Sequence, residues 1–403
     1  MCLWAEAHAR NAETSAMAKR RRVALMLELD WPFKRHHDVF AGTQQYAQEK
    51  GGWECIVDAQ AQETLAGPRR AKAAYDGIIA RVTPQLAEAA RRAGVPVVNV
   101  WTSSPVLDVP LVLPDFAAAG RMAAEHLIGR GFRHFGFLGF TRQRSNKTSR
   151  QAFEAAVAGA GFSCSSLTVP PSYAERPGHW GTFNDRLDQW IAAWQRPIGV
   201  YVTYDLLCRY LACACLRAGV RIPTEAALVG THNEPLICAH PEPSLTSIEL
   251  GYQRVGYRAA ELLDQMMDGT PTPVEEILIE PAALLPRQST DVLAVDDPLV
   301  ALALRFASEH GHERIKVGDV AAAVHVTRRT LERRFRAVLG RSIRDEIVRL
   351  RIERAKRLLA QGRTPIKRLA SEAGFRDDMQ MCTEFKRLEG ITPSEYRRQR
   401  RLG

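Results

Sequence analysis

The sequence of 403 residues lacks a long hydrophobic segment, since no run of 18 uncharged apolar residues occurs in it. Its first residues, MCLWAEAHARNAETSAMAKRRR, also lack the apolar core that a secretory signal peptide needs. These absences argue against a transmembrane helix and against export. We therefore expect a cytoplasmic protein with no membrane partner, in which residues 1–20 form an N-terminal tail.

Motifs for catalysis and metal binding are absent as well. The chain has no G-x-x-x-x-G-K-[ST] phosphate loop, no G-x-S-x-G turn and no G-x-G-x-x-G after an apolar run. The eight cysteines form no C-x-x-C pair, and Cys208, Cys213 and Cys215 fall in an apolar helical stretch, which predicts buried reduced thiols. His36 and His37 are adjacent, point in different directions on a helix and have no third ligand at helical spacing. The sequence predicts neither an enzyme nor a bound metal or cofactor.

Positive charge is concentrated at the C-terminal end of the chain. Residues 298–403 contain 25 Lys and Arg against 13 Asp and Glu, whereas the first 297 residues contain 30 and 32. A basic block of this size behind a neutral region is typical of a domain that binds a polyanion such as nucleic acid.

The neutral region alternates short apolar runs with longer amphipathic stretches. The helical stretches include residues 116–128 and 206–218, and seven runs are strand-like: VALMLEL, ECIVDA, DGIIARV, VPVVNV, HFGFLGF, IGVYVTY and ALVGTH. Such alternation favours an α/β fold with parallel sheets covered on both faces, and about 270 residues suggest two lobes with a cleft between them. A ligand would bind at the carboxyl ends of the strands.

Three quoted segments of this region resemble the sugar-binding core of LacI/GalR-type regulators, which is similar to periplasmic sugar-binding proteins. They are PDFAAAGRMAAEHLIGRGFRHFGFLGF, VYVTYDLLCRYLACACLRAGVRIPTEAALVGTHNEP and PSLTSIELGYQRVGYRAAELLDQMMDG. The resemblance implies a sugar-binding domain over residues 21–290. It also places Asp205 at a ligand-contacting strand end, although the same residue could instead cap the following helix.

The resemblance marks further ligand candidates where this chain departs from the family. His232, followed by Asn233, stands where the family usually has Asp, and Ser149 stands where it often has Arg. Near the first strand end, Trp31 and Phe33 could stack on a sugar ring, with His36 and His37 as polar neighbours. The alternative for these aromatic residues is packing within their own lobe.

The basic region contains one unit twice, behind a linker predicted at residues 291–300. Ala321 recurs as Ala370, Phe335 as Phe385 and Gly340 as Gly390. Each unit consists of a short Ala-rich helix, a turn and a second amphipathic helix, which is the pattern of a helix-turn-helix. The sequence thus predicts an all-α domain with two such units over residues 301–403.

The second helix of the first unit combines a packing face with a charged face. Thr327 is a predicted N-cap, and Leu331, Phe335 and Val338 are predicted to be buried. DNA contacts are predicted for Thr327 at the start of the helix and, on the charged side, for Arg328, Arg329, Glu332, Arg333 and Arg336. A merely solvated charged face is the alternative, and the tandem repeat argues against it.

The basic region resembles the AraC/XylS-type DNA-binding domain, most clearly in LASEAGFRDDMQMCTEFKRLEGITPSEYRR. The resemblance implies a long helix over residues 343–359, with Ile343, Ile347, Leu350 and Leu358 inward and its arginines outward. It implies a second recognition helix whose DNA-facing residues are Asp378, Met379, Gln380, Thr383 and Lys386. Because carboxylates repel phosphate, we expect this helix to contribute less affinity than the first.

A LacI-like sensor ahead of an AraC-type reader resembles the xylose-operon regulator type. This implies a sugar-responsive, sequence-specific transcription regulator, an activator of a catabolic operon, with xylose as the default effector. Double-stranded operator DNA, RNA polymerase and a second copy of the chain are the expected partners. The competing interpretations are a sugar-processing enzyme with an accessory nucleic-acid domain and a ligand-independent architectural DNA binder.

Overall fold

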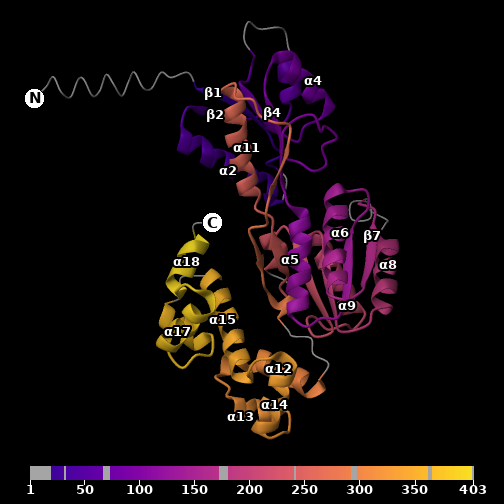
Figure 1. The fold of residues 1–403 in the computed structure, drawn as a ribbon, viewed down its shortest axis with the longest axis vertical. Coiled ribbons are helices and arrows are strands. Elements are labelled where there is room, and N and C mark those ends of the chain that lie inside the picture. The colour runs from indigo at the N-terminus through magenta and orange to yellow at the C-terminus, as the bar shows by residue number, and fades with distance from the viewer. Residues whose placement is uncertain are drawn as a thin grey trace, which may run out of the picture.

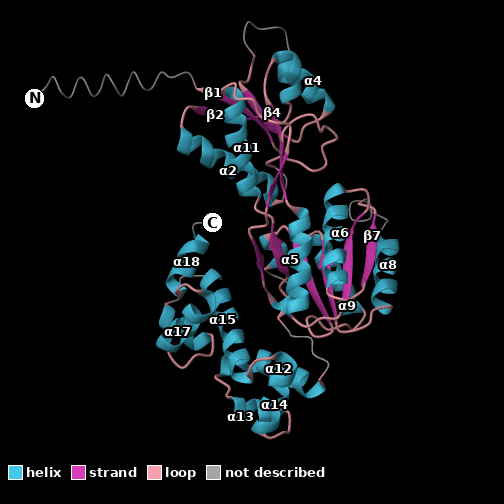
Figure 2. Cartoon of the chain, in the orientation of Figure 1, coloured by secondary structure: helices cyan, strands magenta, loops and turns pink. Residues whose placement is uncertain are grey.

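The computed structural model describes residues 20–30, 33–66, 73–171, 180–239, 242–291, 297–361 and 365–401. These residues form two α/β lobes and a helical C-terminal region (Figure 1). Figure 2 shows that all the strands belong to the lobes. The predicted fold class is therefore confirmed. None of the described helices combines the length and apolar character that crossing a membrane requires.

Lobe 1 is built on a parallel sheet of six strands in the order β11-β5-β4-β3-β1-β2. The strands are β1 (Arg21–Met26), β2 (Trp53–Val57), β3 (Gly77–Ala80), β4 (Val97–Asn99), β5 (Leu111–Pro114) and β11 (Glu276–Ile279). Its helices are α2 (Lys34–Lys50), α3 (Ala61–Ala66), α4 (Pro84–Ala93) and α11 (Tyr252–Met267). The central strands are fully buried, as their continuous apolar runs predict.

Lobe 2 repeats this plan with the strand order β12-β10-β9-β8-β6-β7, in which only β12 is antiparallel among the described strands. The strands are β6 (His134–Phe140), β7 (Cys164–Val169), β8 (Ile198–Val202), β9 (Ala226–Thr231), β10 (Thr246–Glu249) and β12 (Ala283–Leu285). Its helices are α5 (Phe116–Gly129), α6 (Arg144–Gly159), α8 (Trp180–Ala192), α9 (Asp205–Arg217), α10 (Pro235–Cys238) and the 3₁₀ turn η1 (Gln288–Thr290).

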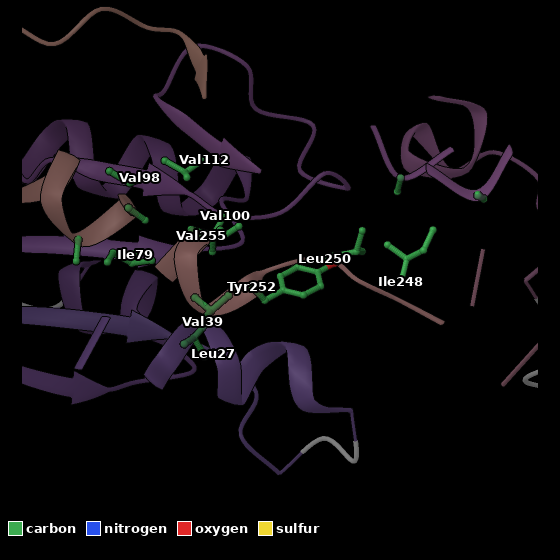
Figure 3. Close-up of a cluster of buried hydrophobic side chains, with 14 of the residues drawn as sticks. Leu27, Val39, Ile79, Val98, Val100, Val112, Ile248, Leu250, Tyr252 and Val255 are labelled. Carbon is green, nitrogen blue, oxygen red and sulfur yellow. The ribbon is translucent and has the colours of Figure 1, made fainter. Parts of the chain in front are cut away.

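The chain passes between the lobes three times: from β5 to α5, from β10 to α11, and from β11 to β12. An apolar cluster follows the second crossing, as Figure 3 shows, from Ile79 and Val98 in lobe 1 through Tyr252 to Leu250 and Ile248. Because these three segments all connect the lobes, we expect any relative motion of the lobes to be a hinge motion about them.

Two helix pairs in the lobes pack at very short range. A Cβ atom on Gly256 of α11 would lie 2.0 Å from the backbone oxygen of Val39 in α2, and one on Gly42 would lie 1.8 Å from the oxygen of Gln253. Between α5 and α6, a Cβ on Gly120 would lie 2.4 Å from the oxygen of Ser149. Glycine is required here because the backbones themselves are in contact.

The C-terminal region contains two small cores joined by one long helix. Its elements are α12 (Pro298–His310), η2 (Gly311–Glu313), α13 (Val317–Ala323), α14 (Arg328–Leu339), α15 (Ile343–Gln361), α16 (Ile366–Glu372), α17 (Asp378–Glu389) and α18 (Pro393–Arg401). Helix α15 contributes Ile343 and Ile347 to the first core and Ile352 and Leu359 to the second. Each core therefore supports one helix-turn-helix unit.

Four local predictions differ from the structure. Val338 is 40% exposed, because it lies in the last turn of α14 beyond the core, where Leu339 packs instead. Not all arginines of α15 face outward: Arg351 is 9% exposed and donates to the backbone oxygens of Gly311 and Ile315 at 3.1 and 2.8 Å. Cys213 is exposed, unlike Cys208 and Cys215.

The fourth difference concerns the expected linker. Helix α12 begins at Pro298, three residues before the predicted start of the C-terminal domain at residue 301. Asp297 caps the helix through contacts to the amides of Leu299 and Val300 at 3.0 and 3.2 Å. Residues 292–296 of the predicted linker, and residues 1–19 of the predicted tail, lie outside the described part of the chain.

Candidate ligand cleft and nucleic-acid interface

A cleft of about 1050 Å³ separates the two lobes. Its walls come largely from residues that follow the strands at their carboxyl ends: Leu27 and Glu28 after β1, Arg81 after β3, Trp101 after β4, Arg142 after β6, Tyr204 after β8 and His232 after β9. This is where parallel sheets gather ligand-contacting groups, because loops and helix N-termini converge there.

A column of five rings crosses the cleft from one lobe to the other, in which four rings are stacked and His36 is tilted against the fourth. The ring centroids of His36 and Trp101 are 4.3 Å apart, and Trp101 stacks on Tyr252 with a centroid distance of 6.3 Å. Tyr252 stacks on His232 at 5.9 Å with only 10° between the planes, and His232 stacks on Tyr204 at 4.8 Å. Such a wall offers flat apolar faces with polar edges, a surface suited to the ring of a sugar.

His232 occupies the centre of this column in an unusual backbone conformation. Its φ of 95° is rare for a residue with a side chain, and its amide donates to the oxygen of Ile248 at 2.9 Å. The side chain is 5% exposed and its Nδ1 makes no hydrogen bond within the described residues. Burial, helped by Arg35 and Lys34, lowers the pKa of His232 well below its ordinary value, so the ring is neutral.

Arg35 and His36 bring the first turn of α2 into the cleft. The guanidinium of Arg35 lies 5.3 Å from the centroid of the Trp101 ring, in cation–π range. The Nδ1 of His36 accepts from the amide of Glu28 at 3.1 Å, which leaves the proton on Nε2. Burial first, then Arg35, His37 and Arg81, lower the pKa of His36 to about 4.

Asp205 turns away from this cleft and into lobe 2. It is 1% exposed and accepts hydrogen bonds from the Ser247 hydroxyl at 2.6 Å and from the Glu234 amide at 2.8 Å. Burial raises its pKa to about 7. Asp205 also lines a smaller cavity of about 290 Å³, to which Phe33 and Arg35 of lobe 1 and Tyr204 and His232 of lobe 2 contribute as well. As placed, Asp205 joins α9 to the loop after β9 and to β10, and does not cap its own helix.

Of the remaining predicted ligand residues, some line a cavity and others do not. Phe33 lines the smaller cavity with Asp205. Asn233 is held between Glu249 and Arg287 at 3.1 and 2.6 Å, outside both cavities.

Two more of the predicted ligand residues line neither the cleft nor the smaller cavity. Ser149 is buried within α6, and His37 is exposed on α2. Trp31 lies outside the described residues. The sequence analysis missed Trp101, Tyr204 and Tyr252, whose common signal is a position immediately after a strand or at the start of a helix.

Charged contacts join the lobes on either side of the cleft. The amide of Lys34 in lobe 1 donates to both carboxylate oxygens of Glu234 in lobe 2, at 3.2 and 3.3 Å, and its ammonium contacts Glu249. Arg144 in lobe 2 pairs with Glu276 in lobe 1 at 2.5 Å. We call these contacts the interlobe latch. They favour the arrangement of the lobes seen here.

Helix α14 has the two faces that the sequence predicts. The Thr327 hydroxyl accepts from the amide of Thr330 at 3.2 Å, and Leu331 and Phe335 are fully buried. Arg329, Arg333 and Arg336 are exposed. Arg328 pairs with Glu332 at 2.8 Å along the helix. Three guanidinium groups on one exposed face can hold phosphates and read guanine edges.

Helix α17 presents a different surface. Asp377 caps it by accepting from the Gln380 amide at 2.7 Å, while Met381 and Phe385 are buried. Asp378, Thr383 and Lys386 are exposed, and Met379 is 77% exposed. The side-chain oxygen of Gln380 accepts from the amide of Arg376 at 3.0 Å. An exposed Met beside a carboxylate suits apolar and acceptor contacts with bases better than phosphate binding.

The C-terminal region is attached to lobe 2 through η1. The Thr290 hydroxyl contacts His126 of α5 at 2.9 Å and Thr246 of β10 at 2.8 Å, and Arg130 donates to the Thr290 backbone oxygen. The Ser289 hydroxyl donates to the oxygen of Leu228 in β9 at 2.6 Å. The point of attachment is therefore part of the lobe 2 fold.

Comparison with known proteins supports this division of the chain. Residues 124–290 match a periplasmic binding protein-like domain, and residues 320–399 match a helix-turn-helix domain. The xylose operon regulatory protein of Escherichia coli is 26% identical over 388 residues, covering 94% of this chain and 97% of that protein. That of Haemophilus influenzae is 28% identical, covering 93% and 98%.

A solved structure of the xylose-binding transcription activator XylR is similar over the same extent. It has a TM-score of 0.65 and 26% identity, and the match covers 94% of this chain and 98% of the other. The predicted pairing of a LacI-like sensor with an AraC-type reader is confirmed by these similarities.

Proposed function

We propose that this chain, a sugar-responsive DNA-binding transcription regulator with the domain architecture of the xylose operon regulators, activates a sugar catabolic operon. The observation that carries the proposal is the combination in one chain of an interlobe cleft walled by stacked rings with an exposed arginine face on α14. The proposal requires no enzymatic activity. Xylose is the first effector to test, because it appears in the names of the relatives.

The effector would act by favouring one arrangement of the lobes. The ring column has members on both lobes and on the crossing segment, so a sugar in the cleft contacts both sides at once. A ligand changes a conformational equilibrium only by its differential affinity for the two states. The interlobe latch supports the bound arrangement, because it can form only when the lobes are close.

DNA binding would use two copies of the chain, with α14 contributing most of the affinity. Two helix-turn-helix units in one domain suit adjacent major-groove segments about 34 Å apart. A homodimer then places two such domains on an operator with two half-sites. Activation implies a further contact with RNA polymerase.

Fluorescence anisotropy tests the proposal with the full chain and a duplex selected by it from a random pool. We expect xylose or another monosaccharide to change the dissociation constant of the DNA at least fivefold. Linkage requires the duplex to change sugar affinity by the same factor in calorimetry. Binding of DNA that no sugar alters, together with no heat on sugar addition, would establish an architectural DNA binder instead.

A further inference from the structure

Helices α14 and α17 occupy equivalent places in the two units that α15 joins (Figure 1). Leu331 and Phe335 of α14 are fully buried, and so are Met381 and Phe385 of α17, each 50 positions later in the chain. Before each helix stands a residue whose side chain accepts from the third amide of the helix, and after each stands a glycine with a positive φ. The exposed faces of the two helices can therefore be compared position by position.

The two helices differ in charge. Helix α14 contains five arginines and one glutamate, whereas α17 contains two basic and three acidic residues. In the first turn, the exposed Asp378 of α17 stands where α14 has Arg328. Carboxylates repel the phosphate backbone of DNA, whereas guanidinium groups bind it. We therefore expect the contribution of α17 to DNA binding to come mainly from contacts to bases.

The centre of the exposed face is basic in α14 and apolar in α17. Arg329 and Arg333 of α14 correspond to Met379 and Thr383 of α17, and all four side chains are exposed. The Thr383 hydroxyl donates to the backbone oxygen of Met379 at 2.9 Å, so its hydrogen is directed back to its own helix. The Met379 side chain, which is 77% exposed, and the Thr383 methyl group lie one helical turn apart on the same face.

The major groove offers one group that complements such an apolar surface. Thymine presents its C5 methyl group there, whereas guanine presents two acceptors that suit the guanidinium groups of α14. A single exposed apolar side chain is ordinary on a protein surface. Met379 differs because it occupies, with Thr383, the positions at which the equivalent helix has arginines.

We propose that α17 reads thymine by its C5 methyl group, which contacts Met379 and Thr383, while α14 reads guanine. This inference rests on the proposed function, since it names the bases that the DNA-binding domain recognises. The operator then has guanines in the major-groove segment at α14 and thymines in the segment at α17, about one helical turn away. Helix α14 supplies affinity, and α17 adds specificity with little charge.

Replacement of thymine by uracil tests the proposal on the full chain, because uracil pairs with adenine as thymine does and lacks only the methyl group. The probe is the duplex that the chain selects from a random pool, with each thymine replaced in turn, and fluorescence anisotropy gives the dissociation constant. We expect a loss of about fourfold for each methyl group that α17 buries. The sensitive thymines should lie about one helical turn from the guanines at which Arg333→Ala loses specificity.

Matched variants assign the effect to α17. Met379→Ala should bind the thymine duplex more weakly and should no longer distinguish it from the uracil duplex, whereas Met379→Leu should retain much of the difference. Thr383→Ser keeps the hydroxyl and removes the methyl group, so part of the difference should be lost. Arg329→Ala, at the equivalent position of α14, should weaken DNA binding and keep the full response to uracil. Circular dichroism and the unfolding midpoint establish that the variants are folded.

The possible results separate this inference from the proposed function. If uracil were tolerated at every position of a duplex that the chain binds, thymine reading would be overturned while DNA binding would stand. If Met379→Ala and the wild type responded equally to uracil, another group would read the methyl and the role of Met379 would be refuted. If the chain selected no duplex from the pool, the proposed function itself would fail.

Discussion

Tyr204 and Asp205 are neighbours at the end of β8 and both line the smaller cavity, yet of the two only Tyr204 also lines the cleft. The ring of Tyr204 stacks in the cleft, while the Asp205 carboxylate turns into lobe 2. The sequence reveals that both follow a strand, but the direction of each side chain depends on residues 232–234, which follow β9, and on Ser247 of β10. For the same reason the stacking of Trp101, Tyr252 and His232, which are distant in sequence, could not be predicted.

The buried carboxyl of Asp205 predicts a pH-dependent stability. Its pKa is raised from 3.8 to about 7 in the folded protein, so it binds a proton on folding between these values. The stability that proton binding at Asp205 contributes is therefore fully present below pH 4. As the pH rises to 7 this contribution is lost, and the free energy of unfolding falls by up to about 4 kcal/mol. Urea unfolding of the wild type and Asp205→Asn should give free energies of unfolding that diverge over this range. Parallel pH profiles would contradict the prediction.

Arg333 provides a test of base reading at a single side chain. It is exposed on the face of α14 opposite Leu331 and Phe335, which we propose to face DNA. We expect Arg333→Ala to cost about 1–3 kcal/mol at one base-pair position and to relax specificity there. Competition among operator variants measures this, with Arg91→Ala of lobe 1 as the control. An equal loss on every duplex would assign Arg333 to phosphate contact.

Among the helices and strands, those with continuous apolar runs or clear helical periodicity could be predicted from the sequence. All seven strand-like runs became strands, and residues 116–128 and 206–218 became α5 and α9 with ends shifted by one residue. The sequence analysis missed β5, β7, β10, β11 and β12, which are either very short or partly exposed, as in CSSLTV of β7. Their strand character depends on neighbours in the sheet, which local pattern does not contain.

The contact between α2 and α11 yields a prediction about helix packing. Gly256→Ala places a methyl group 2.0 Å from the Val39 oxygen, so the helices must separate. Overpacking of this kind costs about 1–3 kcal/mol. Thermal unfolding should show a lowered midpoint for Gly256→Ala, whereas Gly129→Ala at the end of α5, with no atom within 4 Å, should be neutral or slightly stabilising. Equal midpoints for the two variants would show that the helices separate freely.

For the whole molecule, the interlobe latch sets how readily the cleft opens. Glu249→Gln weakens the contact with the Lys34 ammonium, in which both side chains are about one fifth exposed. Such a pair contributes about 1 kcal/mol, so effector affinity should fall roughly fivefold as open molecules accumulate. Calorimetry gives the affinity, and small-angle scattering should record a larger radius of gyration in the absence of effector.

A variant of a pair within one helix is the control for this experiment. Glu88→Gln removes one carboxylate partner of Arg91 and of Arg92 on α4 without changing a contact to the other lobe. It should leave both affinity and dimensions unchanged. If Glu249→Gln behaved in the same way, the latch would have no part in closure.

The three crossings between the lobes also determine the order in which the chain can fold during synthesis. Lobe 1 begins with β1 but needs Val255, Ala259 and Leu263 of α11 to cover its sheet, and β11 to complete it. Lobe 2 lies almost entirely between these two parts, from α5 to β10. On the ribosome, strands β1 to β5 must therefore wait with one face of their sheet only partly covered, by α2, until α11 emerges after lobe 2, and apolar surface exposed in this way is prone to aggregation.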